Sequence, residues 1–180
     1  MAALRLLDGS ALLEAAAGRG RGSRRRVADR DRLLASYAAA VAARRRPLSI
    51  RVGGVWRDMV DATMAVGRAW SSAGVSWAAT GLVASMVLAP FASNVSTGEV
   101  YVAGRLLSDL ARAAALAGLA PVDGGRLLLS VFPTAATGRL VEEVGGMLVA
   151  PWPRVFADLR MSGVRGEDVA EHLREVCSAA

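Results

Sequence analysis

The sequence contains no lysine, and all 22 of its basic residues are arginine. A chain without lysine cannot form a lysine Schiff base or carry the lysine of a phosphate-binding P-loop. It also has one histidine, His172, and one cysteine, Cys177. One residue of each cannot complete a zinc site of cysteines and histidines. A catalytic dyad or triad would have to be built around His172 alone, and we expect this residue at the surface or end of a terminal helix.

Other features also lack catalytic character. The neighbouring acids Glu142 and Glu143 would point to opposite faces of a strand, and Glu167 and Asp168 would diverge on a helix. Cys177 has no partner for a disulfide, which fits a reducing cytoplasm. We therefore expect a cytoplasmic protein that is not an enzyme and uses no cofactor or metal.

The segment 69–98 has no charged residue before Glu99, which raises the question of a membrane span. A spanning helix needs about 20 apolar residues in succession. Ser76, Thr80, Gly81 and Ser85 interrupt the run and Pro90 stops it, so the sequence favours a buried helix. No secretory leader is recognisable at the N-terminus.

Charge is distributed unevenly along the chain. Residues 1–57 hold 13 arginines against four acids, whereas residues 58–180 hold nine arginines against 12 acids. Such asymmetry indicates either a polyanionic partner for the basic part or a solubilising, partly disordered arm. The densest cluster lies in an exposed loop or wing predicted at 18–26, where flexible guanidinium groups could neutralise phosphates. Its members, the candidate nucleic-acid-binding residues, are Arg19, Arg21, Arg24, Arg25 and Arg26.

A second cluster, Arg44 to Arg46, precedes Pro47, which disfavours helical geometry at Arg46. We interpret this cluster as the C-terminal end of a helix, where the dipole favours positive charge. The interpretation is structural rather than functional.

Apolar periodicity and turn residues predict an α+β fold of mixed helices and short antiparallel strands and hairpins. It occupies residues 47–180, behind a short basic N-terminal segment, residues 1–46. Gly145-Gly146 and Asp123-Gly124-Gly125 indicate hairpin turns. The predicted helices are 4–17, 30–43, 56–72, 77–88, 105–116, 151–159 and 166–176, and the predicted strands are 48–52, 100–102, 121–122, 126–132, 140–144 and 147–150.

Four stretches, in this order, resemble the AbiEi family of antitoxins from type IV toxin–antitoxin systems. Tyr37 followed by Arg46-Pro47-Leu48 is similar to the link between that family's DNA-binding module and its main domain. The segments 74–82 and 100–102 resemble its central helix and a short strand. The block 147–174 resembles its two C-terminal helices, with an aromatic residue ahead of an Asp-Leu pair at Asp158.

The resemblance covers about residues 37–176 and implies a bacterial transcriptional regulator with an N-terminal winged helix-turn-helix. Such a regulator represses its own operon by binding promoter DNA. It counters a nucleotidyltransferase-like toxin encoded nearby, without forming a stable complex with it. The sequence departs from this pattern at the front, because only 36 residues precede Tyr37 and a winged module needs roughly 60 to 80. No recognition-helix residue is carried over.

Two main hypotheses follow. In the first, the chain is an antitoxin-like regulator that binds DNA through its basic N-terminal segment. In the alternative, it is a non-catalytic interaction domain that has lost DNA binding. A membrane-associated protein and an enzyme rank below both.

Overall fold

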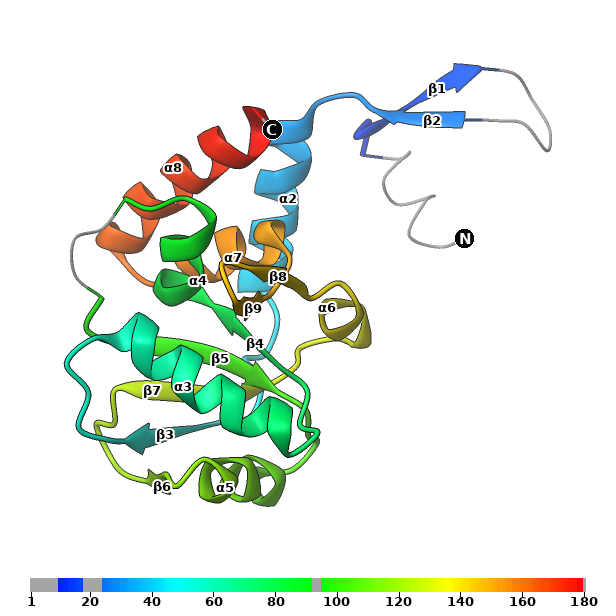
Figure 1. The fold of residues 1–180 in the computed structure, drawn as a ribbon. Helices are drawn as coiled ribbons and strands as arrows, with labels where there is room; N and C mark the ends of the chain where they lie inside the picture. The colour runs from blue at the N-terminus through cyan, green and yellow to red at the C-terminus, as the bar shows by residue number, and fades with distance from the viewer. Residues whose placement is uncertain (1–9, 18–23, 92–94, 180) are drawn as a thin grey trace. The chain divides into compact units, whose positions relative to one another are not determined.

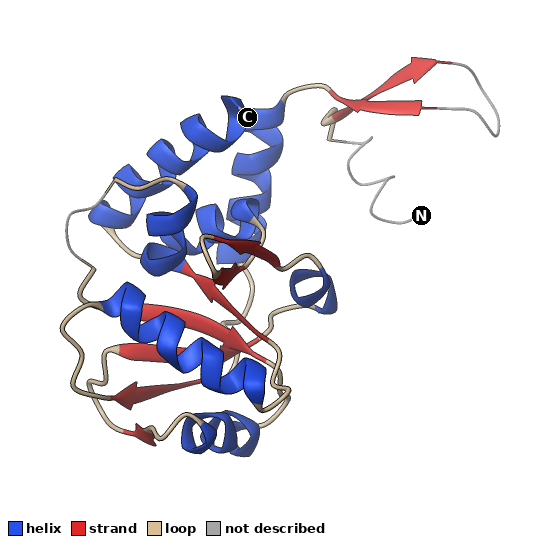
Figure 2. Cartoon of the chain, in the orientation of Figure 1, coloured by secondary structure: helices blue, strands red, loops and turns tan. Residues whose placement is uncertain are grey.

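The computed structural model describes residues 10–17, 24–91 and 95–179. The chain divides into two compact units, Met1–Ala43 and Arg44–Ala180. The sequence analysis placed this boundary after Arg46. Figure 1 labels the helices and strands, and Figure 2 distinguishes them by type.

The first unit contains an antiparallel hairpin followed by a helix. Strand β1 (Leu13–Ala17) pairs with β2 (Arg24–Val27), and α2 (Arg30–Ala42) follows. Helix α2 confirms the prediction for 30–43, and the Asp29 carboxylate caps it by accepting a hydrogen bond from the Arg32 amide at 2.9 Å.

The predicted helix at 4–17 is wrong from Leu13 onward, where the chain forms β1. The alanines of this stretch favour a helix, but an isolated helix of so few residues is marginal in water. Pairing with β2 gives the same backbone groups partners in a hairpin. Residues 4–9 of the predicted helix lie outside the described residues.

The second unit is built on a sheet whose described strands run in the order β6-β3-β7-β5-β4-β9-β8. The pairs β5–β7 and β4–β9 are parallel, and the other neighbouring strands are antiparallel. The α+β class is thus confirmed, with a mixed sheet rather than short antiparallel pairs alone. The strands are β3 (Ser49–Gly53), β4 (Trp77–Thr80), β5 (Gly98–Val102), β6 (Ala120–Pro121), β7 (Leu127–Val131), β8 (Glu142–Val144) and β9 (Met147–Val149).

Helices join and cover these strands. They are α3 (Met59–Ser72), α4 (Gly81–Leu88), α5 (Leu107–Leu116), α6 (Ala135–Arg139), α7 (Trp152–Leu159) and α8 (Val164–Ala179). A helix was predicted at 56–72, and the observed helix α3 begins three residues later, at Met59. The Asp58 side chain caps α3 by accepting a hydrogen bond from the Asp61 amide at 2.9 Å.

One face of the sheet is apolar and forms the main core. Alternate residues of the central strands, including Val52, Leu127 and Val100, point to this face and are buried. Helix α3 lies across it, as Figure 1 shows. The Trp70 indole N–H of α3 donates to the carbonyl oxygen of Ala113 in α5 at 2.7 Å, which links the two helices beside the sheet.

The predicted helix at 77–88 is wrong in its first part. Trp77–Thr80 is the fully buried strand β4, and only Gly81–Leu88 is helical. The break falls at Gly81, whose φ of 58° lies in the left-handed region that glycine adopts without steric cost. A short apolar run reads alike as a buried strand or a buried helix, so periodicity could not separate the two.

The two glycine-rich turns have different outcomes. Gly145-Gly146 joins β8 to β9 in an antiparallel hairpin, as predicted. Asp123-Gly124-Gly125 does not close a hairpin, because β6 and β7 each pair with β3, which lies between them. The turn chemistry at this position was recognised, but the strand order was not.

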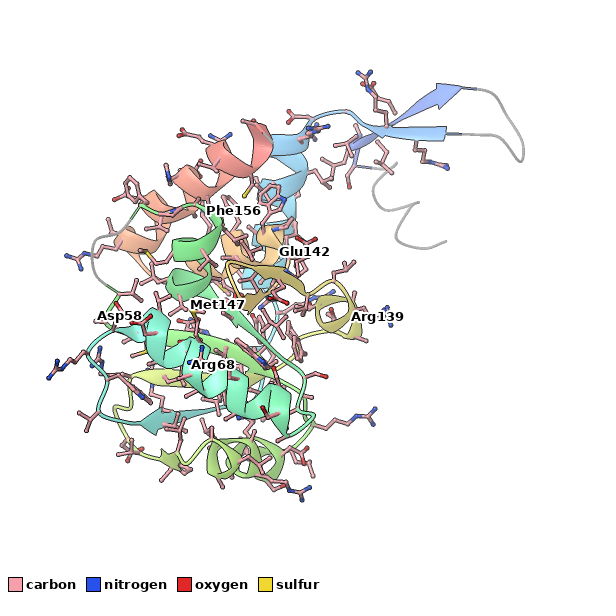
Figure 3. The ribbon with its side chains drawn as sticks, in the orientation of Figure 1. Asp58, Arg68, Arg139, Glu142, Met147 and Phe156 are labelled. Atoms are coloured by element: carbon pink, nitrogen blue, oxygen red, sulfur yellow. The ribbon has the colours of Figure 1, made fainter. Side chains whose placement is uncertain are left out.

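Three side chains labelled in Figure 3 illustrate the interior and the surface of the second unit. Met147 of β9 and Phe156 of α7 are buried, whereas Arg139 at the end of α6 is exposed and points outward (Figure 3). Within the described ranges, no helix combines the length and apolar character needed to cross a bilayer.

Candidate functional site

The second face of the sheet carries polar residues. Arg51 on β3 pairs in register with Leu128 on β7, which pairs with Glu99 on β5, which pairs with Thr80 on β4. Residues paired across neighbouring strands point to the same side of a sheet. The row two residues away on each strand adds further polar groups to this face: Ser49, Ser130 and Tyr101.

This polar face forms the floor of a pocket of about 150 Å³. Helix α7 and the residues just after it supply its other wall, and all of its lining belongs to the second unit. The lining residues are Arg46, Pro47, Ser49, Arg51, Thr80, Glu99, Val100, Tyr101, Leu128, Ser130, Arg154, Asp158, Met161 and Ser162.

A buried cluster centred on Asp158 closes the inner end of the pocket. The Asp158 Oδ2 atom accepts hydrogen bonds from Thr80 Oγ1 at 2.5 Å, Tyr101 OH at 2.6 Å and Arg154 Nε at 3.1 Å. Its Oδ1 atom forms an ion pair with Arg154 Nη2 at 2.8 Å. The strands supply two of these groups and α7 supplies the other two, so the cluster fastens α7 to the polar face of the sheet.

The local arrangement follows from helical geometry. Arg154 and Asp158 are four residues apart on α7, which places them on one face of the helix, and both side chains are less than a tenth exposed. The Arg154 guanidinium also lies 5.3 Å from the centroid of the Tyr101 ring and donates from Nε to the Tyr101 hydroxyl oxygen at 2.9 Å. The buried cation therefore has a carboxylate, a hydroxyl and an aromatic face as neighbours.

Tyr101 is held as a neutral phenol. Burial raises the pKa of its hydroxyl far above the ordinary range, and the negative charge of Asp158 raises it further. The hydroxyl thus keeps its proton and donates it to Asp158 in a hydrogen bond.

Glu99 differs from Asp158 in having its carboxyl group open to the pocket. It is half-buried, and among the described residues no hydrogen bond or ion pair to its carboxyl is found. Burial raises the pKa of Glu99, and the charge of Asp158 acts in the same direction, while Arg51 and Arg46 act against both. The Ser130 hydroxyl, on a buried residue, also has no hydrogen-bond partner among the described residues.

Two exposed arginines stand at the mouth of the pocket. Arg51 Nη1 donates to the carbonyl oxygen of Gly125 at 3.2 Å, and Arg46 lines the mouth next to Pro47. The pocket therefore offers two cationic groups outside and one carboxyl group inside, whereas the oxygens of Asp158 are already engaged. Neither here nor elsewhere in the described ranges do three metal-ligating side chains lie close enough together to hold a metal ion.

The five arginines predicted to bind nucleic acid lie in the other unit. Arg24, Arg25 and Arg26 form most of β2, so this end of the predicted loop is a strand of a hairpin. Arg25 and Arg26 are exposed. Arg19 and Arg21 lie outside the described residues.

The remaining candidates lie away from the pocket. The His172 ring on α8 stacks against Phe91, with ring centroids 4.8 Å apart and planes at 28°. Cys177 is half-buried, and this burial raises the pKa of its thiol. Glu142 and Glu143 on β8 are exposed, as are Glu167 and Asp168 on α8.

The Asp158 cluster and the pocket were not predicted from the sequence. Two local signals were available. Arg154 and Asp158 have the spacing of a helical ion pair, and Glu99 and Tyr101 alternate on one strand, so they share a face. Which strand lies next to which helix was not visible in the sequence, and that pairing creates the site.

Comparisons of this chain with family models, with curated proteins and with solved structures find no match. The geometry of the two units and the pattern of residues therefore carry the functional argument.

Proposed function

We propose that this chain is a cytoplasmic, antitoxin-like transcriptional regulator, without catalytic activity, that contacts DNA through the hairpin β1–β2. The observation that carries the proposal is the run of three consecutive arginines that makes up most of β2. The resemblance to the AbiEi family supplies the biological setting, namely a toxin–antitoxin operon.

The hairpin concentrates positive charge over a short length of chain. From Ser10 to Val27 the sequence holds five arginines and a single acid, Glu14. Glu14 is paired in register with Arg26, so one carboxylate faces this cluster across the hairpin. Successive residues of a strand point to opposite faces, so the exposed residues Arg25 and Arg26 point to opposite faces of β2. Both faces of β2 thus present guanidinium groups.

Such a surface suits the phosphate backbone of DNA. Guanidinium groups bind phosphate oxygens with good geometry, and each neutralised phosphate releases condensed counterions. Phosphate contacts of this kind give affinity and orientation but do not read sequence. The hairpin is therefore the part of the regulator that holds the duplex, in the manner of a wing.

The stretches that carry the resemblance meet in the fold. Three of the four stretches that carry it contain Thr80, Tyr101 and Asp158, which are linked by hydrogen bonds in one buried cluster. The ordered pattern in the sequence thus coincides with the residues that join α7 to the sheet. A nucleotidyltransferase-like toxin encoded next to this chain is the expected partner, countered without a stable complex.

The test is a fluorescence anisotropy titration with a labelled duplex from the promoter of the chain's own gene and a shuffled duplex of equal composition. We expect tighter binding of the promoter duplex, and weaker binding of both duplexes by the triple variant Arg24→Ala, Arg25→Ala, Arg26→Ala. The matched control is Arg105→Ala, Arg139→Ala, Arg165→Ala, which removes the same charge from exposed positions in the second unit.

Two results would decide against the regulator. Equal affinity for promoter and shuffled duplexes would leave only a non-specific arginine arm. Equal loss of binding in the hairpin triple and the control triple would show that overall charge, and not the hairpin, attracts DNA. A neighbouring open reading frame for a nucleotidyltransferase-like protein, whose toxicity this chain relieves on co-expression, would support the antitoxin role independently.

The second candidate function is a non-catalytic interaction domain that does not bind DNA. It is favoured by the pocket, which is complete within Arg44–Ala180 and uses no residue of the hairpin. Under this alternative, the hairpin triple variant relieves toxicity as well as the unchanged chain does.

A further inference from the structure

The pocket over the polar face of the sheet contains groups that the folded chain leaves unused. Asp158 is saturated, because both of its oxygens are bonded to side chains of the cluster. The Glu99 carboxyl and the Ser130 hydroxyl are different, since within the described residues neither has a hydrogen-bond partner. Among the described residues, no buried side-chain oxygen or nitrogen lacks a hydrogen-bond partner, so these two groups reach the solvent of the pocket, and a ligand that enters it can bond to them in place of water.

The charges around the cavity define what that partner needs. Glu99 in its ionised form can only accept hydrogen bonds, and an ammonium group offers it both N–H donors and a complementary charge. Arg46 and Arg51 at the mouth are donors and require an anionic oxygen pair such as a carboxylate. Arg51 and Glu99 are separated by one strand, β7, which puts their backbones roughly 10 Å apart, within reach of a long arginine side chain and a small ligand.

The size and charge of the cavity limit the ligand further. Its volume of about 150 Å³ is below the roughly 300–1,000 Å³ of typical ligand pockets, which favours a small ligand. A bare phosphate would bring further negative charge next to the Glu99 carboxylate. A small molecule with one cationic and one anionic end satisfies both sides.

We propose that this pocket is a binding site for a small zwitterionic ligand of the α-amino acid class, whose ammonium meets Glu99 and whose carboxylate meets Arg46 and Arg51. Ser130 supplies a further hydroxyl to the ligand from the floor of the pocket. The inference does not depend on DNA binding, because every lining residue belongs to the second unit.

The experiment is isothermal titration of the full chain with glycine, L-alanine, L-serine, L-aspartate and L-glutamate, each up to about 10 mM, a range that covers affinities weaker than 1 mM. Acetate and methylamine, which carry one half of the zwitterion each, and inorganic phosphate are the comparison ligands. We expect saturable binding of at least one amino acid and at least tenfold weaker binding of acetate, methylamine and phosphate.

Two variants and a matched control assign the binding to this pocket. Glu99→Gln and Arg46→Gln should each weaken amino-acid binding at least tenfold. Arg44→Gln removes an exposed arginine two positions away that does not line the pocket, and it should leave binding unchanged. Circular dichroism of each variant verifies that it is folded.

Three outcomes would overturn the proposal. The first is that no amino acid gives a heat of binding. The second is that phosphate or acetate binds as tightly as the best amino acid. The third is that the unchanged chain and Glu99→Gln bind the amino acid with equal affinity. The second outcome would identify a plain anion site formed by the arginines.

Discussion

The Asp158 cluster makes a quantitative prediction about the stability of the second unit. Replacing Asp158 by asparagine keeps the size of the side chain and one acceptor oxygen, but removes the negative charge that faces Arg154. Hydrogen bonds to charged groups contribute about 1.5–3 kcal/mol each, and the Arg154 cation would remain buried without a counter-charge. We expect Asp158→Asn to lower the free energy of unfolding by about 2–4 kcal/mol, and Tm by about 4–16 °C.

The assay is urea unfolding followed by tryptophan fluorescence. All four tryptophans lie in the second unit, and Trp70 and Trp77 are buried beside the sheet, so the signal reports on this unit. Arg154→Met and the double variant complete a thermodynamic cycle. Each single change leaves the other charge buried without its partner. The double variant should therefore lower the free energy of unfolding by less than the sum of the two single variants.

The control is Glu171→Gln, which breaks exposed ion pairs with Arg160 at 3.1 Å and Arg174 at 2.8 Å. Pairs of this kind contribute about 0–1 kcal/mol. If Asp158→Asn costs no more than Glu171→Gln, or if the costs of the two single changes in the cluster simply add, the reasoning from the buried network is refuted.

Two further predictions concern single positions of the second unit. Burial raises the pKa of Glu99, so ionisation of this carboxyl group opposes folding. The free energy of unfolding is therefore higher at low pH, where Glu99 is protonated, and falls as the pH rises through the folded-state pKa. Glu99→Gln should therefore have a higher Tm than the unchanged chain at neutral pH. In a pH series of thermal melts, this difference in Tm should vanish below the ordinary glutamate pKa of 4.5. A difference in Tm that stays constant across the series would contradict the prediction. Gly67 on α3 packs directly against the Trp77 ring and leaves no room for a β-carbon. Gly67→Ala should therefore lower the free energy of unfolding by about 1–3 kcal/mol in the urea assay. The control is Gly138→Ala, where a β-carbon has ordinary contacts and should not show this overpacking cost.

Local signals in the sequence predicted much of the second unit. The Gly145-Gly146 hairpin was predicted from its turn residues, and α5, α7 and α8 from apolar spacing and flanking residues. These features depend on neighbours within a few positions, which a single sequence displays directly. The same holds for Asp29, whose side chain caps the helix that follows it.

The errors arose where distant segments decide the structure. Trp77–Thr80 becomes a strand because β5 and β9 flank it, and Leu13–Ala17 becomes a strand because Arg24–Val27 pairs with it. The candidate pocket depends on the same kind of information. Thr80 and Asp158 are 78 positions apart, and only the packing of α7 against the sheet brings their side chains to 2.5 Å.

The central claim, that the hairpin holds DNA by its phosphates, is tested most directly by the salt dependence of duplex binding. Each phosphate contact contributes about −0.9 to the slope of log K against log salt concentration. The hairpin triple variant, Arg24→Ala, Arg25→Ala, Arg26→Ala, should therefore have a slope shallower than that of the unchanged chain by about 2.7, and the control triple should match the unchanged chain. Indistinguishable slopes for the hairpin triple and the unchanged chain would contradict the claim.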